Sequence, residues 1–122
     1  MMGSSPADLS LRGLVEVELE RHRWAASVGD VGSAWWALER AHIVSQSDLL
    51  VHLRIHVIML GYALRTADLR EAGGQLLRLA LAPLGALSGR TPIGNTGRAR
   101  VDPFAPMPVP GDLRRALEES AG

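Results

Sequence analysis

Three of the four histidines have a spacing that suits one metal ion. His52 and His56 are four residues apart, so on a helix about 40° separates them around the axis and both lie on one face. Two imidazoles in this arrangement form a recurrent metal-binding pair. Taken alone the pair is a weak signal, because two histidines in an apolar helix are more often packed and hydrogen-bonded in a core.

His42 strengthens the metal hypothesis. It precedes a polar break at residues 45–48 by about as many residues as His52 follows it. Residues equidistant from a tight turn lie at the same height on antiparallel helices, whose axes are about 8–10 Å apart. We therefore expect the three imidazoles to converge. Glu39, three residues before His42, is expected as a fourth ligand or as an orienting group, but one Glu-x-x-His unit falls short of a di-iron centre.

Three imidazoles and a carboxylate suit a divalent transition metal, and the candidates are Zn, Cu, Ni, Co and Fe. Six further residues are expected around the ion as pocket or supporting groups: Glu18, Gln46, Met59, Trp35, Asn95 and Phe104. For Met59, core packing is the simpler role. His22 lies among charged residues, which predicts a solvated position outside the site.

Three functions remain open on these residues. An open coordination position would make the protein a small metalloenzyme with a small-molecule substrate, whereas a closed one would make it a carrier or sensor. Alternatively, the histidines are structural, and a helical hairpin with Trp35 and Trp36 binds another protein or a second copy of the chain. The third hypothesis is a metal-free enzyme with histidine as general base.

The composition excludes several other classes. The chain has no cysteine, which rules out disulfides, thiolate catalysis and cysteine zinc sites. Its 13 basic residues, all arginine, balance 13 acidic ones, so a nucleic acid or an anionic membrane surface is not an expected partner. No apolar run reaches the roughly 18 residues of a membrane span. The first residues lack a signal-peptide pattern, which predicts a cytoplasmic protein.

Apolar periodicity predicts an all-α fold, a small antiparallel bundle of about four helices in a single domain, 1–122. The expected helices span 8–27, 34–44, 49–66 and 69–81, with Pro83 and Gly85 ending the last one. Short connections make successive helices antiparallel neighbours. This helical body, 8–86, is followed by a different segment, 87–122.

The C-terminal segment contains five of the seven prolines, which excludes helix interiors and central strands between residues 92 and 110. Apolar residues recur along it, and we expect an extended strap rather than a disordered tail. The strap would cover the metal site near Asn95 and Phe104 and end in a short helix, 112–119.

Several strings of residues resemble known families. LERAHIVSQ (38–46), His52, His56, TPIGNTG (91–97) and PFAPMPVP (103–110) together resemble a small bacterial family known as domain of unknown function thirty-seven hundred and three. This resemblance covers roughly residues 18–113 and implies that the histidine hairpin and the strap belong together, without implying an activity. Residues 25–41 resemble the inter-helix turn of a tetratricopeptide repeat, but no second copy follows at the repeat period of about 34 residues.

Overall fold

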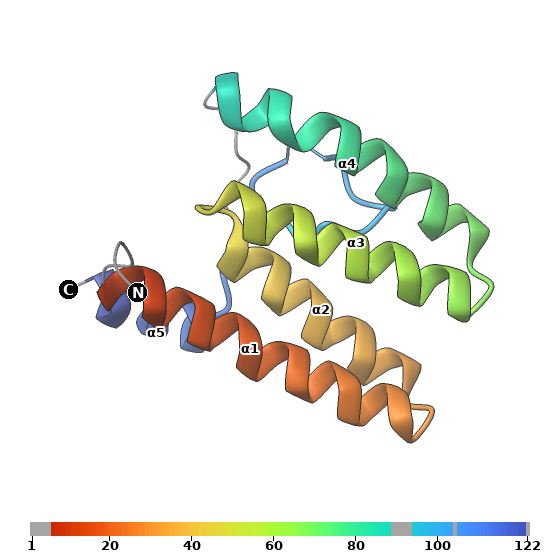
Figure 1. The fold of residues 1–122 in the computed structure, drawn as a ribbon, viewed down its shortest axis with the longest axis horizontal. Helices are drawn as coiled ribbons and strands as arrows, with labels where there is room; N and C mark the ends of the chain where they lie inside the picture. The colour runs from red at the N-terminus through yellow and green to blue at the C-terminus, as the bar shows by residue number, and fades with distance from the viewer. Residues whose placement is uncertain (1–5, 89–93, 104, 122) are drawn as a thin grey trace.

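The computed structural model describes residues 6–88, 94–103 and 105–121. These residues form five α-helices and no strand, which confirms the all-α prediction: α1 (Pro6–Ser27), α2 (Val31–Ser45), α3 (Leu49–Arg65), α4 (Leu69–Ser88) and α5 (Gly111–Ala121). Helices α1 to α4 lie side by side in chain order, and α5 packs on α1 and α2 (Figure 1). No described helix has the length and apolarity that a bilayer-spanning segment needs.

Aspartate side chains cap the N-termini of three of the helices. Asp30 accepts a hydrogen bond from the Ser33 amide at the start of α2, and Asp48 accepts one from Val51 at the start of α3. Asp68 does the same for α4. Each bond satisfies one of the amides that a helix start leaves without an internal partner. The connections between these helices, residues 28–30, 46–48 and 66–68, are short, so neighbouring helices run antiparallel.

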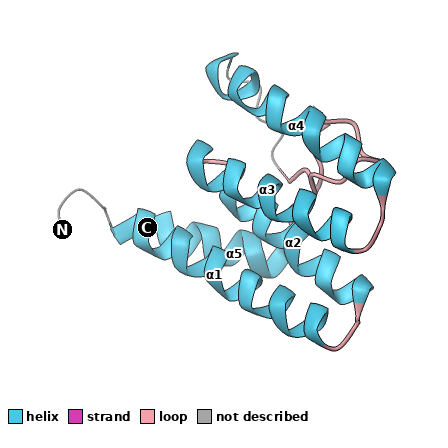
Figure 2. Ribbon diagram, turned by 45° about the vertical axis from the view of Figure 1, so that its right-hand side comes forward, coloured by secondary structure: helices cyan, strands magenta, loops and turns pink. Residues whose placement is uncertain are grey.

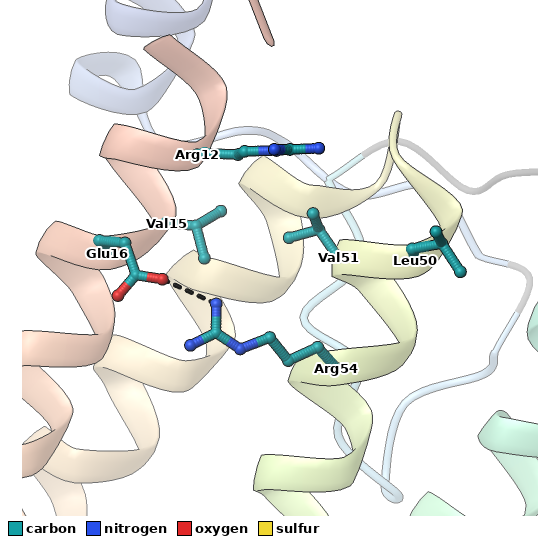
Figure 3. A pocket seen from close by; sticks show the side chains of 6 residues that line it. All are labelled: Arg12, Val15, Glu16, Leu50, Val51 and Arg54. Carbon is teal, nitrogen blue, oxygen red and sulfur yellow. Dashed lines mark hydrogen bonds and ion pairs between the residues drawn. The ribbon is translucent and has the colours of Figure 1, made fainter. Parts of the chain in front are cut away.

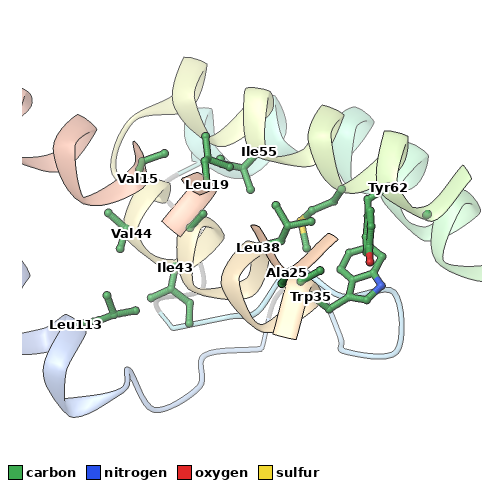
Figure 4. Close-up of a cluster of buried hydrophobic side chains, with 14 of the residues drawn as sticks. Val15, Leu19, Ala25, Trp35, Leu38, Ile43, Val44, Ile55, Tyr62 and Leu113 are labelled. Atoms are coloured by element: carbon green, nitrogen blue, oxygen red, sulfur yellow. The ribbon is translucent and has the colours of Figure 1, made fainter. Parts of the chain in front are cut away.

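The core lies mainly between α1, α2 and α3. Leu19, Leu38, Ile55 and Met59 are fully buried there (Figure 4 shows most of this cluster). The Trp35 ring packs edge-on to Tyr62, with ring centroids 5.3 Å apart. This packing fixes α3 against α2 and therefore sets the height at which their polar residues face each other.

His22 corrects one prediction. It is buried rather than solvated: its Nδ1 lies 3.0 Å from the Ala34 carbonyl oxygen, and its ring packs edge-on to Tyr62. His22 stands three residues after Leu19 and therefore lies on the buried face of α1, in spite of its charged neighbours in the sequence.

Helix α4 continues past the predicted end. Pro83 lies inside the helix, which ends at Ser88 and not near Leu81. Proline removes one helical hydrogen bond, but α4 packs closely on α3 alone among the described helices, and Pro83 is only partly buried. Water at this edge of the molecule can satisfy the freed carbonyl group, so the break that the sequence predicts does not occur.

Residues 94–103 and 105–110, the described part of the chain between α4 and α5, cross the helices without regular secondary structure and are called the crossing segment below (Figure 2). The buried Asn95 side chain organises this crossing: its Nδ2 donates to the carbonyl oxygens of Asp102 and Ala105, and its Oδ1 accepts from the Gly97 amide. Phe104 and Ile93, two of the expected apolar anchors, lie outside the described residues.

Replacing Pro83 with alanine should stabilise the protein, because a proline costs a helix interior about 3 kcal/mol relative to alanine. Its restriction of the unfolded chain offsets roughly 0.4–1 kcal/mol of that cost. We expect Pro83→Ala to raise the free energy of unfolding by roughly 2–2.6 kcal/mol in urea denaturation. No gain, or a loss, would contradict a helix that runs through this position.

Candidate metal centre

The three histidines singled out in the sequence meet at one point. His42 lies in the last turn of α2, and His52 and His56 lie in the first half of α3. The distances between their Nε2 atoms are 2.9 Å for His42–His52, 3.0 Å for His52–His56 and 3.1 Å for His42–His56. Among the described residues, these three form the group of side chains whose ligand atoms are close enough to share an ion.

The cluster is removed from water. His42 and His56 are 3% and 2% exposed, and His52 is half-buried. Burial lowers the pKa of all three imidazoles, most of all that of His42, and takes the pKa of His52 to about 4. Their mutual repulsion as cations lowers the pKa of His42 and His52 further. At neutral pH the three rings are therefore uncharged.

A backbone carbonyl determines which nitrogen of His42 carries the proton. Nδ1 of His42 lies 2.7 Å from the carbonyl oxygen of Asn95. A carbonyl oxygen only accepts, so Nδ1 must donate. The neutral ring has one N–H, and its Nε2 consequently directs a lone pair into the cluster.

The same reasoning fixes His56, through Gln75 on α4. Nδ1 of His56 lies 2.7 Å from Gln75 Oε1. The Gln75 amide nitrogen donates to a Glu71 carboxylate oxygen at 2.7 Å and to the Gly97 carbonyl at 2.8 Å. Both are acceptors only, which fixes the orientation of the amide. Nδ1 of His56 therefore donates, and its Nε2 also carries a lone pair.

These two lone pairs face each other across 3.1 Å. The neutral ring of His52 has a single N–H, which it can donate to Nε2 of either His42 or His56. The contact between His42 and His56 still has no hydrogen-bond donor. A cation between the rings would turn this repulsion into attraction. Burial disfavours a proton in that role, as the lowered pKa values indicate, whereas a metal ion binds neutral imidazoles.

A partly buried network of charged side chains lies on the outer side of the cluster. Glu71 accepts from Arg98 Nε at 2.7 Å and from the Ala99 amide at 3.0 Å. Arg98 also donates to Glu39 at 3.1 Å and stacks 4.0 Å above the Trp35 ring. The network joins α2, α4 and the crossing segment around Gln75, so the orientation of His56 depends on all three.

Gly97 lies directly against the cluster. A Cβ at this position would lie 2.6–2.8 Å from three atoms of the His42 ring, and its φ of +80° suits glycine. Glycine therefore allows the crossing segment to pack on the imidazole.

Two predicted carboxylates are held elsewhere. Glu39 is paired with Arg98 and lies outside the group of ligand atoms. Glu18 is buried, but it pairs with Arg40 at 3.1 Å and with Arg21 at 3.1 Å. The cluster as described therefore consists of neutral side chains.

The other predicted pocket residues have mostly structural contacts. Gln46 accepts from the Gly94 amide at 3.0 Å, Met59 is fully buried in the core, and Trp35 supports Arg98. Asn95 contributes its carbonyl to His42, and Phe104 lies outside the described residues.

Sequence reasoning missed Gln75 and Glu71. Both are buried in α4, where they stand four residues apart and share a face with the buried Arg78. Such a polar stripe on a helix that is otherwise rich in leucine is the signal that could have identified them.

A separate hollow of about 300 Å³ opens between α1 and α3 (Figure 3). Arg54 and Glu16 form a 2.7 Å ion pair at its side, and no histidine is among its lining residues. The hollow is therefore distinct from the cluster.

Acid should destabilise the metal-free protein before its carboxylates titrate. The folded pKa values of the three histidines lie below the unfolded value of about 6.5, and that of His52 is about 4. The unfolded chain therefore binds more protons between these values, and the free energy of unfolding falls as pH decreases through 6.5 towards 4. Urea denaturation with a chelator at about pH 7.5 and pH 5 measures this loss, and His52→Gln should reduce it. Equal stability at both pH values would contradict buried neutral histidines.

No curated protein and no solved structure matches the chain. The comparisons give no support to the local resemblance to a tetratricopeptide repeat. A family model described as "Protein of unknown function (DUF3703)" matches residues 10–117, which include the three histidines, Gln75 and the crossing segment. The chain belongs to this family.

Proposed function

We propose that the protein binds one divalent transition-metal ion through the Nε2 atoms of His42, His52 and His56. The observation that carries this proposal is the convergence of these atoms to within 2.9–3.1 Å, with lone pairs on at least two of them. Packed structural histidines would instead be expected to alternate donors and acceptors. The metal-binding hypothesis accounts for a contact that is repulsive without a cation.

The distances suit metal coordination. Imidazole nitrogens bind zinc at about 2.0–2.1 Å, so two donors 3.0 Å apart subtend about 90–100° at the ion. Tetrahedral donors at the same bond length would be about 3.3–3.4 Å apart. The triangle is therefore closer to one face of an octahedron, a geometry compatible with the imidazole-binding ions Zn, Cu, Ni, Co and Fe.

The outer hydrogen bonds also resemble those of metal sites. Metal-binding histidines generally donate their second N–H to a carbonyl or carboxylate, which fixes the tautomer and the ring orientation. His42 donates to a backbone carbonyl, and His56 donates to an amide oxygen that is itself held by Glu71. These contacts leave the Nε2 atoms of His42 and His56 unprotonated and therefore able to bind an ion.

Three protein ligands leave at least one coordination position for another group. An ion bound by three neutral imidazoles keeps its full charge of +2, so the remaining position favours an anion such as hydroxide. A divalent ion held by the three histidines would lower the pKa of a bound water and so supply a nucleophile at neutral pH, which makes a small metalloenzyme one use of this site. A carrier or sensor would use the same position for a ligand supplied by its partner.

Untagged protein should bind close to one ion per chain, and His52→Ala should weaken that binding by at least about 100-fold, because it removes one of three ligands. Elemental analysis and calorimetric titration measure the two effects. The half-buried His52 is the suitable ligand to replace, since its removal disturbs the core least. His22→Ala is the matched control, a buried histidine outside the cluster, and it should retain the ion. Equal affinities of the two variants would refute the proposal.

Gln75 should act as a positioning residue for the ion. Gln75→Leu removes the acceptor of His56 Nδ1 while keeping the side chain buried, and we expect a 10–100-fold loss of metal affinity. Gln46→Leu, outside the cluster, serves as control. The result would count against this role if both variants bound the metal as the wild type does.

A further inference from the structure

Helices α3 and α4 expose a row of large apolar side chains. On α3 these are Leu50, Val57 and Leu64, and on α4 they are Leu69, Leu76, Leu77 and Leu84. Each is between 53% and 78% exposed. We call these seven residues the α3–α4 face.

The spacing places these residues together on each helix. Leu50, Val57 and Leu64 follow one another at intervals of seven, as do Leu69 and Leu76, and Leu77 and Leu84. Residues seven apart lie on the same side of a helix, which is the spacing of helix–helix interfaces. The side of α4 that carries Gln75 and Arg78 is turned towards the histidines and the crossing segment, so Leu76 points the other way.

The described part of the chain leaves this face uncovered. Helix α4 lies at one edge of the row of helices, with α3 on one side and no helix on the other (Figures 1 and 2). The crossing segment runs along the opposite side, where it contacts Gly74, Gln75 and Arg78. A contiguous apolar surface of several hundred Å² on a protein generally marks an interaction site.

We propose that the α3–α4 face binds the same face of a second copy of the chain, so that two helical hairpins pack into a four-helix interface. At about 100 Å² of exposed area each, the seven side chains provide roughly 700 Å² per copy. A standard stable interface buries about 800 Å² per partner. The exposed area of the face therefore comes close to what a standard interface buries.

Charge also favours self-association. The chain has no net charge, so two copies do not repel each other as a whole. With the two-fold axis perpendicular to the helices, the paired α4 helices run antiparallel, which brings Arg70, near the start of α4, towards the C-terminal end of the other α4. That end carries a partial negative charge from the helix dipole. At Gly73, between Leu69 and Leu76, a Cβ would meet nothing within 4 Å, so the backbones have room to approach.

Sedimentation velocity and light scattering from about 5 to 200 µM protein, with a chelator present, test this interface separately from metal binding. The wild type should be a dimer. Leu76→Glu places a charge at the centre of the face and should raise the dissociation constant at least about 100-fold, while circular dichroism shows unchanged helicity. Val28→Glu is the matched control, because Val28 is 63% exposed in the turn between α1 and α2, and it should remain dimeric.

Val57→Glu, on α3, should also give a monomer and replaces Leu76→Glu if that variant does not fold. A wild type that is monomeric at about 200 µM overturns the proposal. The proposal is equally overturned if that monomer binds phospholipid vesicles or another protein through these leucines. A dimer that Val28→Glu disrupts and the face variants do not would place the interface elsewhere and also overturn it.

Discussion

Two hydrogen bonds on the outer side of the histidine cluster determine which nitrogen of His42 and of His56 carries the proton. His42 donates to the Asn95 carbonyl and His56 donates to the Gln75 amide oxygen, both over 2.7 Å. Each bond places the proton on Nδ1 and leaves the lone pair on Nε2, which faces the other ring. Without these two acceptors the same rings could hydrogen-bond to one another as an ordinary buried group. With them, two lone pairs point into the triangle, and we propose that a metal ion lies between them.

The fold is arranged to keep those acceptors in position. Gln75 is oriented by Glu71, which is held by Arg98, while Asn95 uses its own side chain to close the loop that carries its carbonyl. Burying these charges costs solvation energy that their pairing only partly returns, so a purely apolar contact would serve stability as well. The network is better explained by the geometry it imposes on the imidazoles. The α3–α4 face lies on the opposite side of the hairpin, where association would leave this geometry undisturbed.

Structural features that depend on the spacing of nearby residues could be predicted from the sequence. The start of α3 follows from the capping residue Asp48, and the meeting of His42 with His52 follows from their similar distances to a short turn. The start of α2 was predicted three residues too late, because Asp30 caps the helix and it begins at Val31. Pro83 misled the prediction of where α4 ends, because the cost of a proline depends on whether water reaches the freed carbonyl. The contacts of Gln75 with His56 and of Glu39 with Arg98 could not be predicted, since these partners are 19 and 59 residues apart in the sequence and are brought together only by packing.

Anomalous diffraction from crystals of the metal-loaded protein locates the bound ion. We expect a single strong peak at the absorption edge of the bound metal, about 2.0–2.2 Å from the Nε2 atoms of His42, His52 and His56. Their Nδ1 contacts to Asn95 and Gln75 should be unchanged. A peak at other residues, or metal-soaked crystals in which the three Nε2 atoms stay within 3.1 Å of one another with no ion between them, would contradict this expectation.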